Sequence, residues 1–218
     1  MSFYDRADAG RRLAALLTQY RRRPDVVVLA LPRGGVAVGF EVATALEVPL
    51  DVFLVRKLGV PFQPELAMGA IASGGTRVLN PLVTDALAIA PEVLESVIAR
   101  EQDELERRER VYRQGRPKLD VKGKTAILVD DGIATGSTMR AAVLALREQG
   151  VKEIVVAVPV APQSALAELG SLADELVCVL EPSEFLAIGE WYQDFSQLTD
   201  EDVNELLRQA AQPAAKAG

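Results

Sequence analysis

The sequence predicts an α/β fold with a doubly wound, mostly parallel sheet flanked by helices. Short apolar segments of strand length recur along the chain, and segments with helical periodicity separate them. These apolar runs are continuous rather than alternating, which is typical of strands buried on both faces. The chain has 218 residues, of which 49% are hydrophobic and 25% charged, the composition of an ordinary globular protein.

The first quarter of the chain is predicted to be a helix followed by a β-loop-α-β unit. Leucines on one helical face mark the first helix, which a basic triplet and Pro24 end. Two apolar runs then flank a second helical segment. We expect a helix over 5–20, a strand over 26–31, a helix over 36–46 and a strand over 49–55.

The middle of the chain is less regular. Residues 59–75 are rich in glycine and proline and are predicted to be a loop, with short strands at 68–72 and 77–80. Pro91 suits the first turn of a long helix that runs to about Arg113 and is heavily charged in its second half. We expect the loop, this helix and the C-terminal segment to form a small hood or lid.

The last part of the chain continues the alternation. Strands are expected over 125–129, 154–158 and 175–180, and helices over 137–149, 164–172 and 199–211. Without a repeat or a linker, residues 1–218 are predicted to form a single domain, with a core over about 25–180 and a C-terminal hood or tail over 181–218. Ligands of such sheets bind beyond the carboxyl ends of the strands.

The composition excludes several kinds of chemistry. The chain has no histidine and one cysteine, Cys178, which rules out histidine-dependent catalysis, histidine-containing zinc sites and an internal disulfide. A net charge of −7 disfavours broad binding to nucleic acid or anionic membranes. No apolar run has the length of a membrane span, and the N-terminus does not resemble a signal peptide. We therefore expect a cytoplasmic protein.

The most informative segment is ILVDDGIATGST at 127–138. An apolar strand ends in two adjacent carboxylates, Asp130 and Asp131, and a helix start rich in small and hydroxyl residues follows. Unpaired amides at a helix N-terminus bind phosphate, whereas the acids suit sugar hydroxyls or a magnesium ion. The segment therefore predicts a sugar-phosphate site, in which phosphate binds to Ala134, Thr135, Gly136, Ser137 and Thr138. The alternative is a plain turn and helix cap.

The same twelve residues resemble the signature of type I phosphoribosyltransferases, which bind 5-phosphoribosyl 1-diphosphate. The resemblance implies that Asp130 and Asp131 hold the ribose hydroxyls and stabilise the transition state, while residues 134–138 hold the 5′-phosphate. It extends over about residues 26–180, and the string RKLGVPFQPELAMGAIASGG resembles a subgroup of predicted phosphoribosyltransferases whose substrate is unsettled. A homodimer is also what the resemblance suggests.

The loop after the first core strand is expected to bind pyrophosphate. Family members use this loop for that purpose, and here it offers a fixed charge on Arg33 and backbone donors at Gly34 and Gly35. A dinucleotide site is the competing interpretation, but the glycine spacing does not match its fingerprint. Arg56 and Lys57, expected at the carboxyl end of the second strand, suit a doubly anionic leaving group or a solvated strand end.

Three aromatic residues near the C-terminus are candidates for stacking on a flat base. Trp191, Tyr192 and Phe195 lie within five residues, and they suit either a base or the packing of the tail onto the core. Enzymes of the family that act on 6-oxopurines carry an acid where this chain has Ala134. That departure argues against such purines and leaves the base or amine acceptor unidentified.

The resemblance implies magnesium-dependent transfer of a phosphoribosyl group to a nitrogen acceptor, with release of pyrophosphate. Magnesium would enter with the diphosphate, without a direct protein ligand, and reach Asp130 or Asp131 through water. Two alternatives stay open: a non-catalytic sensor of the ribosyl diphosphate or of a nucleotide on the same fold, and a nicotinamide-dependent oxidoreductase.

Overall fold

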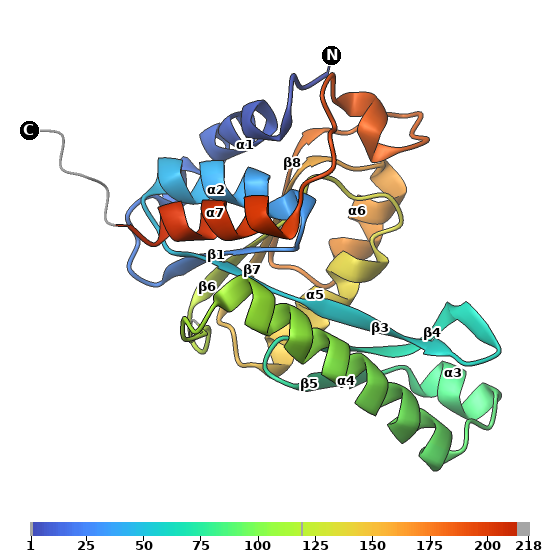
Figure 1. Ribbon diagram of the computed structural model, residues 1–218. Helices are drawn as coiled ribbons and strands as arrows, with labels where there is room; N and C mark the ends of the chain where they lie inside the picture. The colour runs from blue at the N-terminus through green and yellow to red at the C-terminus, as the bar shows by residue number, and fades with distance from the viewer. Residues whose placement is uncertain (1, 119, 213–218) are drawn as a thin grey trace, which may run out of the picture.

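The main sheet of the computed structural model has five parallel strands in the order β2-β1-β6-β7-β8 (Figure 1). The structure describes residues 2–118 and 120–212, so the end of the predicted C-terminal tail lies outside it. The strands are β1 Val26–Ala30, β2 Leu50–Val52, β6 Thr125–Val129, β7 Glu153–Val160 and β8 Glu175–Leu180. The predicted parallel α/β fold is therefore confirmed.

Helices cover both faces of this sheet, because alternate side chains of each strand point to opposite faces. On one face, Val28 and Val129 pack against the apolar sides of α1 (Arg6–Ala15) and α2 (Gly34–Leu46). On the other, Leu29 and Leu128 pack against α5 (Ser137–Glu148) and α6 (Gln163–Leu169). The first helix is shorter than the predicted 5–20, since a 3₁₀ turn, η1 Thr18–Tyr20, follows its end.

The predicted loop over 59–75 is wrong: this region belongs to a second sheet. Strands β3 (Val55–Val60), β4 (Gln63–Ala72) and β5 (Thr76–Leu79) pair antiparallel in that order. The predicted strand over 49–55 is likewise two strands, because β2 ends at Val52 and the chain enters the second sheet at Val55. Leu58 and Val60 are buried at alternate positions, a strand pattern that the nearby glycines and prolines obscure.

The long helix was predicted at its observed bounds, as α4 Pro91–Arg113. It packs against the second sheet through Val97, Ile98 and Leu105, and the short helix α3 (Pro81–Ala86) follows β5. Figure 1 shows this layer at one end of the molecule, away from α1. The second sheet and α4 therefore form a layer of their own, with strands where a loop was expected. That this layer and the C-terminal segment act as a hood or lid stays a prediction.

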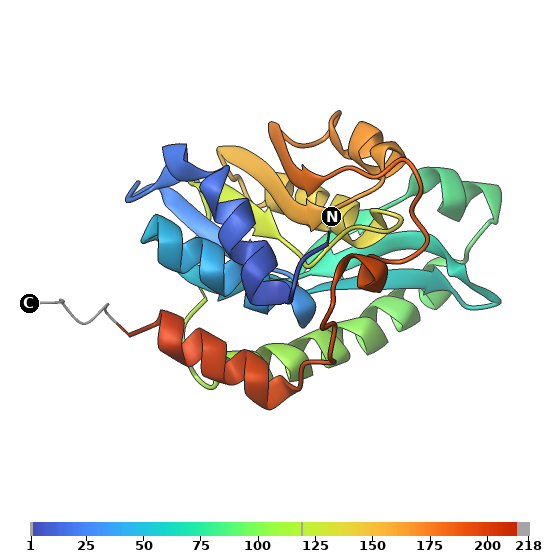
Figure 2. The same ribbon diagram turned by 90° about the horizontal axis from the view of Figure 1, so that it is seen from above.

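The N-terminal segment meets the segment before α7 beside the main sheet (Figure 2). Phe3 is fully buried, and its backbone exchanges hydrogen bonds with Trp191 and Gln193, next to the 3₁₀ helix η2 (Ile188–Trp191). The chain continues into α7 (Asp200–Ala210), which Thr199 opens with a capping box. Among the described residues, no helix is both long enough and apolar enough to cross a membrane.

Candidate active site

The loops after β1 and β6 lie side by side, because these two strands are neighbours in the parallel sheet. Gly34 and Gly35, which begin α2 directly after the loop that follows β1, approach the acid pair so closely that neither position has room for a side chain. A Cβ on Gly34 would lie 1.8 Å from Asp131 Oδ2, and one on Gly35 would lie 2.8 Å from Asp130 Cα. The structure therefore brings together the two loops that the sequence assigned to pyrophosphate and ribose.

The two acids lie in an electrostatically unfavourable arrangement. Asp130 Oδ1 accepts the Asp131 amide at 2.8 Å, and Asp131 Oδ2 accepts Arg6 Nε at 2.8 Å. Burial, followed by the neighbouring Asp131 charge, raises the pKa of Asp130 well above its ordinary value. Burial also raises the pKa of Asp131, although Arg6 opposes that change. A carboxyl pair of this kind favours ligands that donate hydrogen bonds to it.

The predicted phosphate loop forms an open helix start. Gly136 adopts a left-handed backbone with φ 77°, which lets the chain turn sharply into α5. The N-cap residue Gly136 supplies no capping side chain, and the Ser137 amide donates to Thr135 Oγ1 at the long distance of 3.5 Å. Thr135, Ser137 and Thr138 are exposed, as is Ala134. Thr135 Oγ1 and Ser137 Oγ lie 3.2 Å apart. The amides and hydroxyls at this helix start are thus available to an anion.

The five residues predicted to bind pyrophosphate are not all in one place. The Arg33 side chain reaches the segment that leads into α7, where its Nη1 donates to Leu198 O at 2.8 Å and its Nε lies 3.6 Å from Asp200 Oδ1. Arg56 does not lie at the carboxyl end of β2, as predicted, but within β3, where its Nε donates to Glu101 Oε2 at 2.9 Å. The break between β2 and β3 causes this difference.

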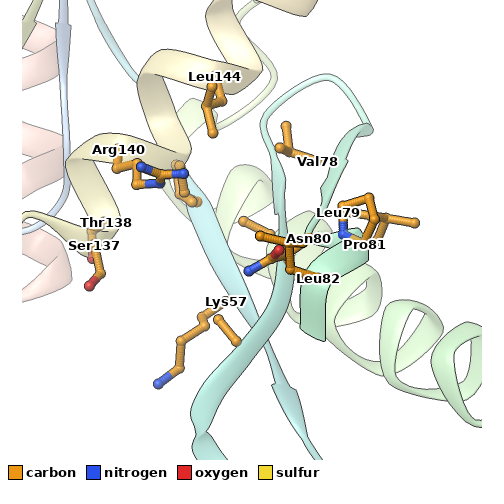
Figure 3. A pocket seen from close by; sticks show the side chains of 15 residues that line it. Lys57, Val78, Leu79, Asn80, Pro81, Leu82, Ser137, Thr138, Arg140 and Leu144 are labelled. Carbon is orange, nitrogen blue, oxygen red and sulfur yellow. The ribbon is translucent and has the colours of Figure 1, made fainter. Parts of the chain in front are cut away.

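Lys57 lines a different space, a cavity of about 440 Å³ between the second sheet and α5 (Figure 3). Ser137 and Thr138 from the phosphate loop lie on one side of it, and Arg140 lies one turn further along α5. Most of the remaining lining is apolar: Val55, Ala67, Ala70, Val78, Leu79, Pro81, Leu82, Ala141 and Leu144. The cavity therefore adjoins the phosphate end of the candidate site rather than the acid pair.

The aromatic candidates pack against the N-terminal segment. Tyr192 is 6% exposed, its ring lies between Phe3 and Phe195, and its hydroxyl donates to Asp131 O. Trp191 is partly buried in the same cluster. Phe195 is 37% exposed, but the Arg6 guanidinium lies over its ring at 4.0 Å from the centroid. Tyr192 is thus a packing residue, and the predicted stacking surface is reduced.

Arg6 is the site residue that the sequence did not reveal. It lies 125 positions from its partner Asp131, so no local spacing connects them. The sequence carried one weak sign of this role. A basic side chain in the first turn of a helix is disfavoured by the helix dipole, so its presence indicates a stabilising contact elsewhere. Both side chains of this ion pair are 12% exposed.

Comparisons with known proteins agree with this geometry. A model of the phosphoribosyl transferase domain matches residues 2–185. Two Mycobacterium tuberculosis proteins, "Putative phosphoribosyl transferase MT0597" and "Putative phosphoribosyl transferase Rv0571c", are each 47% identical over 216 residues. That alignment covers 99% of this chain but 48% of each relative, so the chain spans about half the length of the curated relatives it matches.

A solved structure is similar throughout. The crystal structure of TT1426 from Thermus thermophilus superposes with a TM-score of 0.86 at 46% identity, and the match covers 97% of this chain and 100% of that one. The architecture, the paired acids after β6 and the open start of α5 all lie within the segment that the domain model matches. The chain therefore belongs to the phosphoribosyl transferase domain family.

Proposed function

We propose that the chain transfers the 5-phosphoribosyl group of 5-phosphoribosyl 1-diphosphate to a nitrogen acceptor, with release of pyrophosphate. The observation that carries the proposal is the placement of Asp130 and Asp131 between the glycine loop after β1 and the open helix start of α5. One such site offers acceptors for two hydroxyls and donors for two anionic groups. A ribosyl diphosphate carries the matching groups: two hydroxyls on its ribose, with a phosphate on one side and a diphosphate on the other.

Each part of the substrate has a matching set of protein groups. The 5′-phosphate binds to the amides and hydroxyls of residues 134–138, and the ribose hydroxyls donate to Asp130 and Asp131. The diphosphate lies on Arg33, Gly34 and Gly35, while Lys57 approaches from the cavity beside α5. Arg56 reaches the diphosphate only after it leaves Glu101.

Magnesium fits the chemistry of this site. The carboxylate oxygens of Asp130 and Asp131 are hard donors of the kind magnesium prefers, and an ion carried by the substrate would reach them through water. Within residues 2–118 and 120–212, no cluster of three or more acidic, cysteine or histidine side chains forms a separate metal site. The ion would neutralise charge on the leaving diphosphate. The acids, fixed near C1, stabilise positive charge that develops on the ribose.

A sensor function is the second candidate, and one observation favours it. Two of the aromatic residues expected to stack on a base have other partners: Tyr192 packs against Phe3, and the Arg6 guanidinium lies over the Phe195 ring. A protein that binds the ribosyl diphosphate but no base does not need these aromatic side chains for stacking. A homodimer and a cytoplasmic location stay predictions for either function.

Calorimetry followed by a turnover assay tests the proposal. We expect 5-phosphoribosyl 1-diphosphate with magnesium to bind the wild-type chain, and Asp131→Asn to weaken that binding at least about tenfold, the loss typical of a charged acceptor. Asp51→Asn is the matched control, because Asp51 is also a largely buried acid paired with an arginine. Absence of binding by the wild-type chain would refute both candidate functions.

Pyrophosphate release then separates the enzyme from the sensor. Wild-type protein is incubated with the ribosyl diphosphate, magnesium and each member of a panel of nucleobases and amines. Release that depends on one acceptor and disappears in Asp131→Asn supports the transferase. Tight binding without release across the panel supports the sensor and contradicts the transferase.

A further inference from the structure

Arg6 occupies a central position between three parts of the chain that are distant in sequence. Its Nε donates to Asp131 Oδ2 at 2.8 Å, and its Nη1 donates to Ser196 O at 2.8 Å. The plane of its guanidinium covers the ring of Phe195. Arg6 therefore joins the start of α1, the acid pair and the C-terminal segment before α7 through three separate contacts.

These contacts decide which carboxylate oxygens can receive a ligand. Asp131 uses Oδ2 for Arg6, and Asp130 uses Oδ1 for the Asp131 amide. Among the described residues, the pair's hydrogen bonds come from Arg6, from the Asp131 amide and from one carboxyl group to the other. Arg6 is thus the donor that reaches the pair from a distant part of the chain, and a ribose with two neighbouring hydroxyls offers further donors.

The neighbouring backbone fixes this arrangement further. A Cβ at Gly34 would lie 1.8 Å from Asp131 Oδ2 and 3.1 Å from Arg6 Nε, so the ion pair packs directly against the glycine loop. Tyr192 holds the other side of Asp131, because its hydroxyl donates to the Asp131 carbonyl. The Asp131 side chain is therefore held by a charged partner above a surface that leaves it little room to turn.

We propose that Arg6 is a positioning residue that orients Asp131 so that the acid pair recognises both ribose hydroxyls together. The inference rests on the proposed function and deepens it, since it assigns ribose selectivity to a residue of α1 outside the loop motifs. An arginine suits this role better than a lysine. Its rigid fork serves Asp131 and Ser196 at once, and its flat face stacks on Phe195.

The expected consequence falls on the ribose hydroxyls, and the 2-hydroxyl is the one that the test removes. When Arg6 is absent, Asp131 loses the partner that holds its carboxyl group and no longer meets a hydroxyl in a fixed orientation, whereas the predicted phosphate loop at α5 is unchanged. The test measures displacement of bound 5-phosphoribosyl 1-diphosphate by ribose 5-phosphate and by 2-deoxyribose 5-phosphate. We expect the wild-type chain to prefer the ribose compound by about tenfold, the contribution of one hydrogen bond to a charged group.

Three variants make the test sharp. Arg6→Gln is expected to reduce the preference to less than about twofold, with the affinity for 2-deoxyribose 5-phosphate unchanged. Arg6→Lys keeps the charge and is expected to restore part of the preference. Arg12→Gln is the matched control, because Arg12 lies on the same helix and pairs with Asp8, away from the acids. Thermal unfolding of each variant shows whether the fold is retained.

The outcomes separate the inference from the function on which it rests. If the wild-type chain fails to bind the ribosyl diphosphate, the proposed function falls and the inference with it. If the wild-type chain binds and discriminates, and Arg6→Gln and Arg6→Lys discriminate equally well, Arg6 does not position Asp131. An equal loss of affinity for both sugar phosphates in the Arg6 variants would show a general structural role, and it would overturn the inference too.

Discussion

Asp51 and Asp131 are two acids with similar burial and opposite surroundings. Each forms an ion pair with an arginine, and their side chains are 13% and 12% exposed. Asp51, in the edge strand β2, uses both oxygens: Oδ2 meets Arg113 Nη1 at 2.6 Å, and Oδ1 accepts the Val52 amide at 2.8 Å. Asp131, in the loop after β6, gives Oδ2 to Arg6 and otherwise meets a second carboxyl group, that of Asp130.

The difference shows that burial and pairing alone do not identify a functional acid. A buried polar group normally has its hydrogen bonds satisfied, and Asp51 follows that rule. The pair Asp130 and Asp131 departs from it, because two acids of like charge lie against each other and share a single arginine, Arg6. Two carboxyl groups held together with few donors lower the free energy of unfolding. A ligand whose hydroxyls donate hydrogen bonds to them raises it again.

The largest expected effect is the loss of stability when Asp51, whose two oxygens both accept hydrogen bonds, is replaced. Asp51→Ala leaves Arg113 charged and without its acceptor in a site that is largely closed to water, so we expect the free energy of unfolding to fall by about 3 kcal/mol. Denaturant unfolding measures this change. Glu95→Ala is the control, because the Glu95 side chain is 63% exposed in its pair with Arg77. Equal unfolding midpoints for the wild type and Asp51→Ala would remove the distinction.

A smaller effect of opposite sign is expected at the acid pair. Asp130→Asn removes a buried charge beside Asp131, while the amide oxygen still accepts the Asp131 amide. We expect the free energy of unfolding at pH 8 to rise by about 1 kcal/mol, the lower end of what the removal of buried charge gains. Binding of the ribosyl diphosphate should fall in the same variant, so stability and function change in opposite directions.

The pH dependence of the free energy of unfolding tests whether the buried charge causes the gain in Asp130→Asn. The pKa of Asp130 in the folded chain is raised from its ordinary value of 3.8, so between those two pKa values the native state binds more protons than the unfolded state. Wild-type stability therefore decreases as pH rises through that window, and the variant lacks most of this decrease. The gain in Asp130→Asn should be largest at neutral and alkaline pH and vanish below about pH 3.8. A gain that does not depend on pH would contradict a charge effect.

The sequence was sufficient to predict the main sheet because its strands carry continuous apolar runs. Residues 125–129 are buried at every position, and this pattern has no close alternative. The long helix was predicted equally well, since Pro91 and its apolar periodicity fix its start and its buried face. The family motif then located the acids and the phosphate loop, because those residues are contiguous.

The second sheet and Arg6 could not be predicted for physical reasons. The β3–β4 hairpin pairs Val55 with Ala72, and its stability comes from packing on α4 rather than from local propensity. Glycines at 59, 69, 74 and 75 therefore indicated a loop. Arg6 meets Asp131 only after α1 has packed on the main sheet. Contacts of this kind depend on the assembled fold, and the local spacing of residues does not encode them.

Substitution of Arg56 is expected to have the smallest effect. It separates the roles of Arg33 and Arg56, both of which the sequence predicted to bind pyrophosphate. Its guanidinium is tightly paired with Glu101, whereas the Arg33 guanidinium has a looser contact with Asp200 at 3.6 Å and donates to the Leu198 carbonyl, which an anion can replace. In calorimetry with pyrophosphate and magnesium, we expect Arg33→Gln to lower affinity about tenfold and Arg56→Gln by less than about twofold.

Glu101 keeps Arg100 as a second partner at 3.1 Å, so Arg56→Gln should also cost no more than about 1 kcal/mol of stability. Arg100→Gln, on the exposed side of the same acid, is the matched control for both measurements. If Arg56→Gln instead weakens pyrophosphate binding as much as Arg33→Gln does, the Glu101 pair must open when the ligand binds. An arginine that is already paired would then bind the ligand as well as one with looser contacts. The contrast between Asp51 and Asp131 would not extend to the arginines of this site.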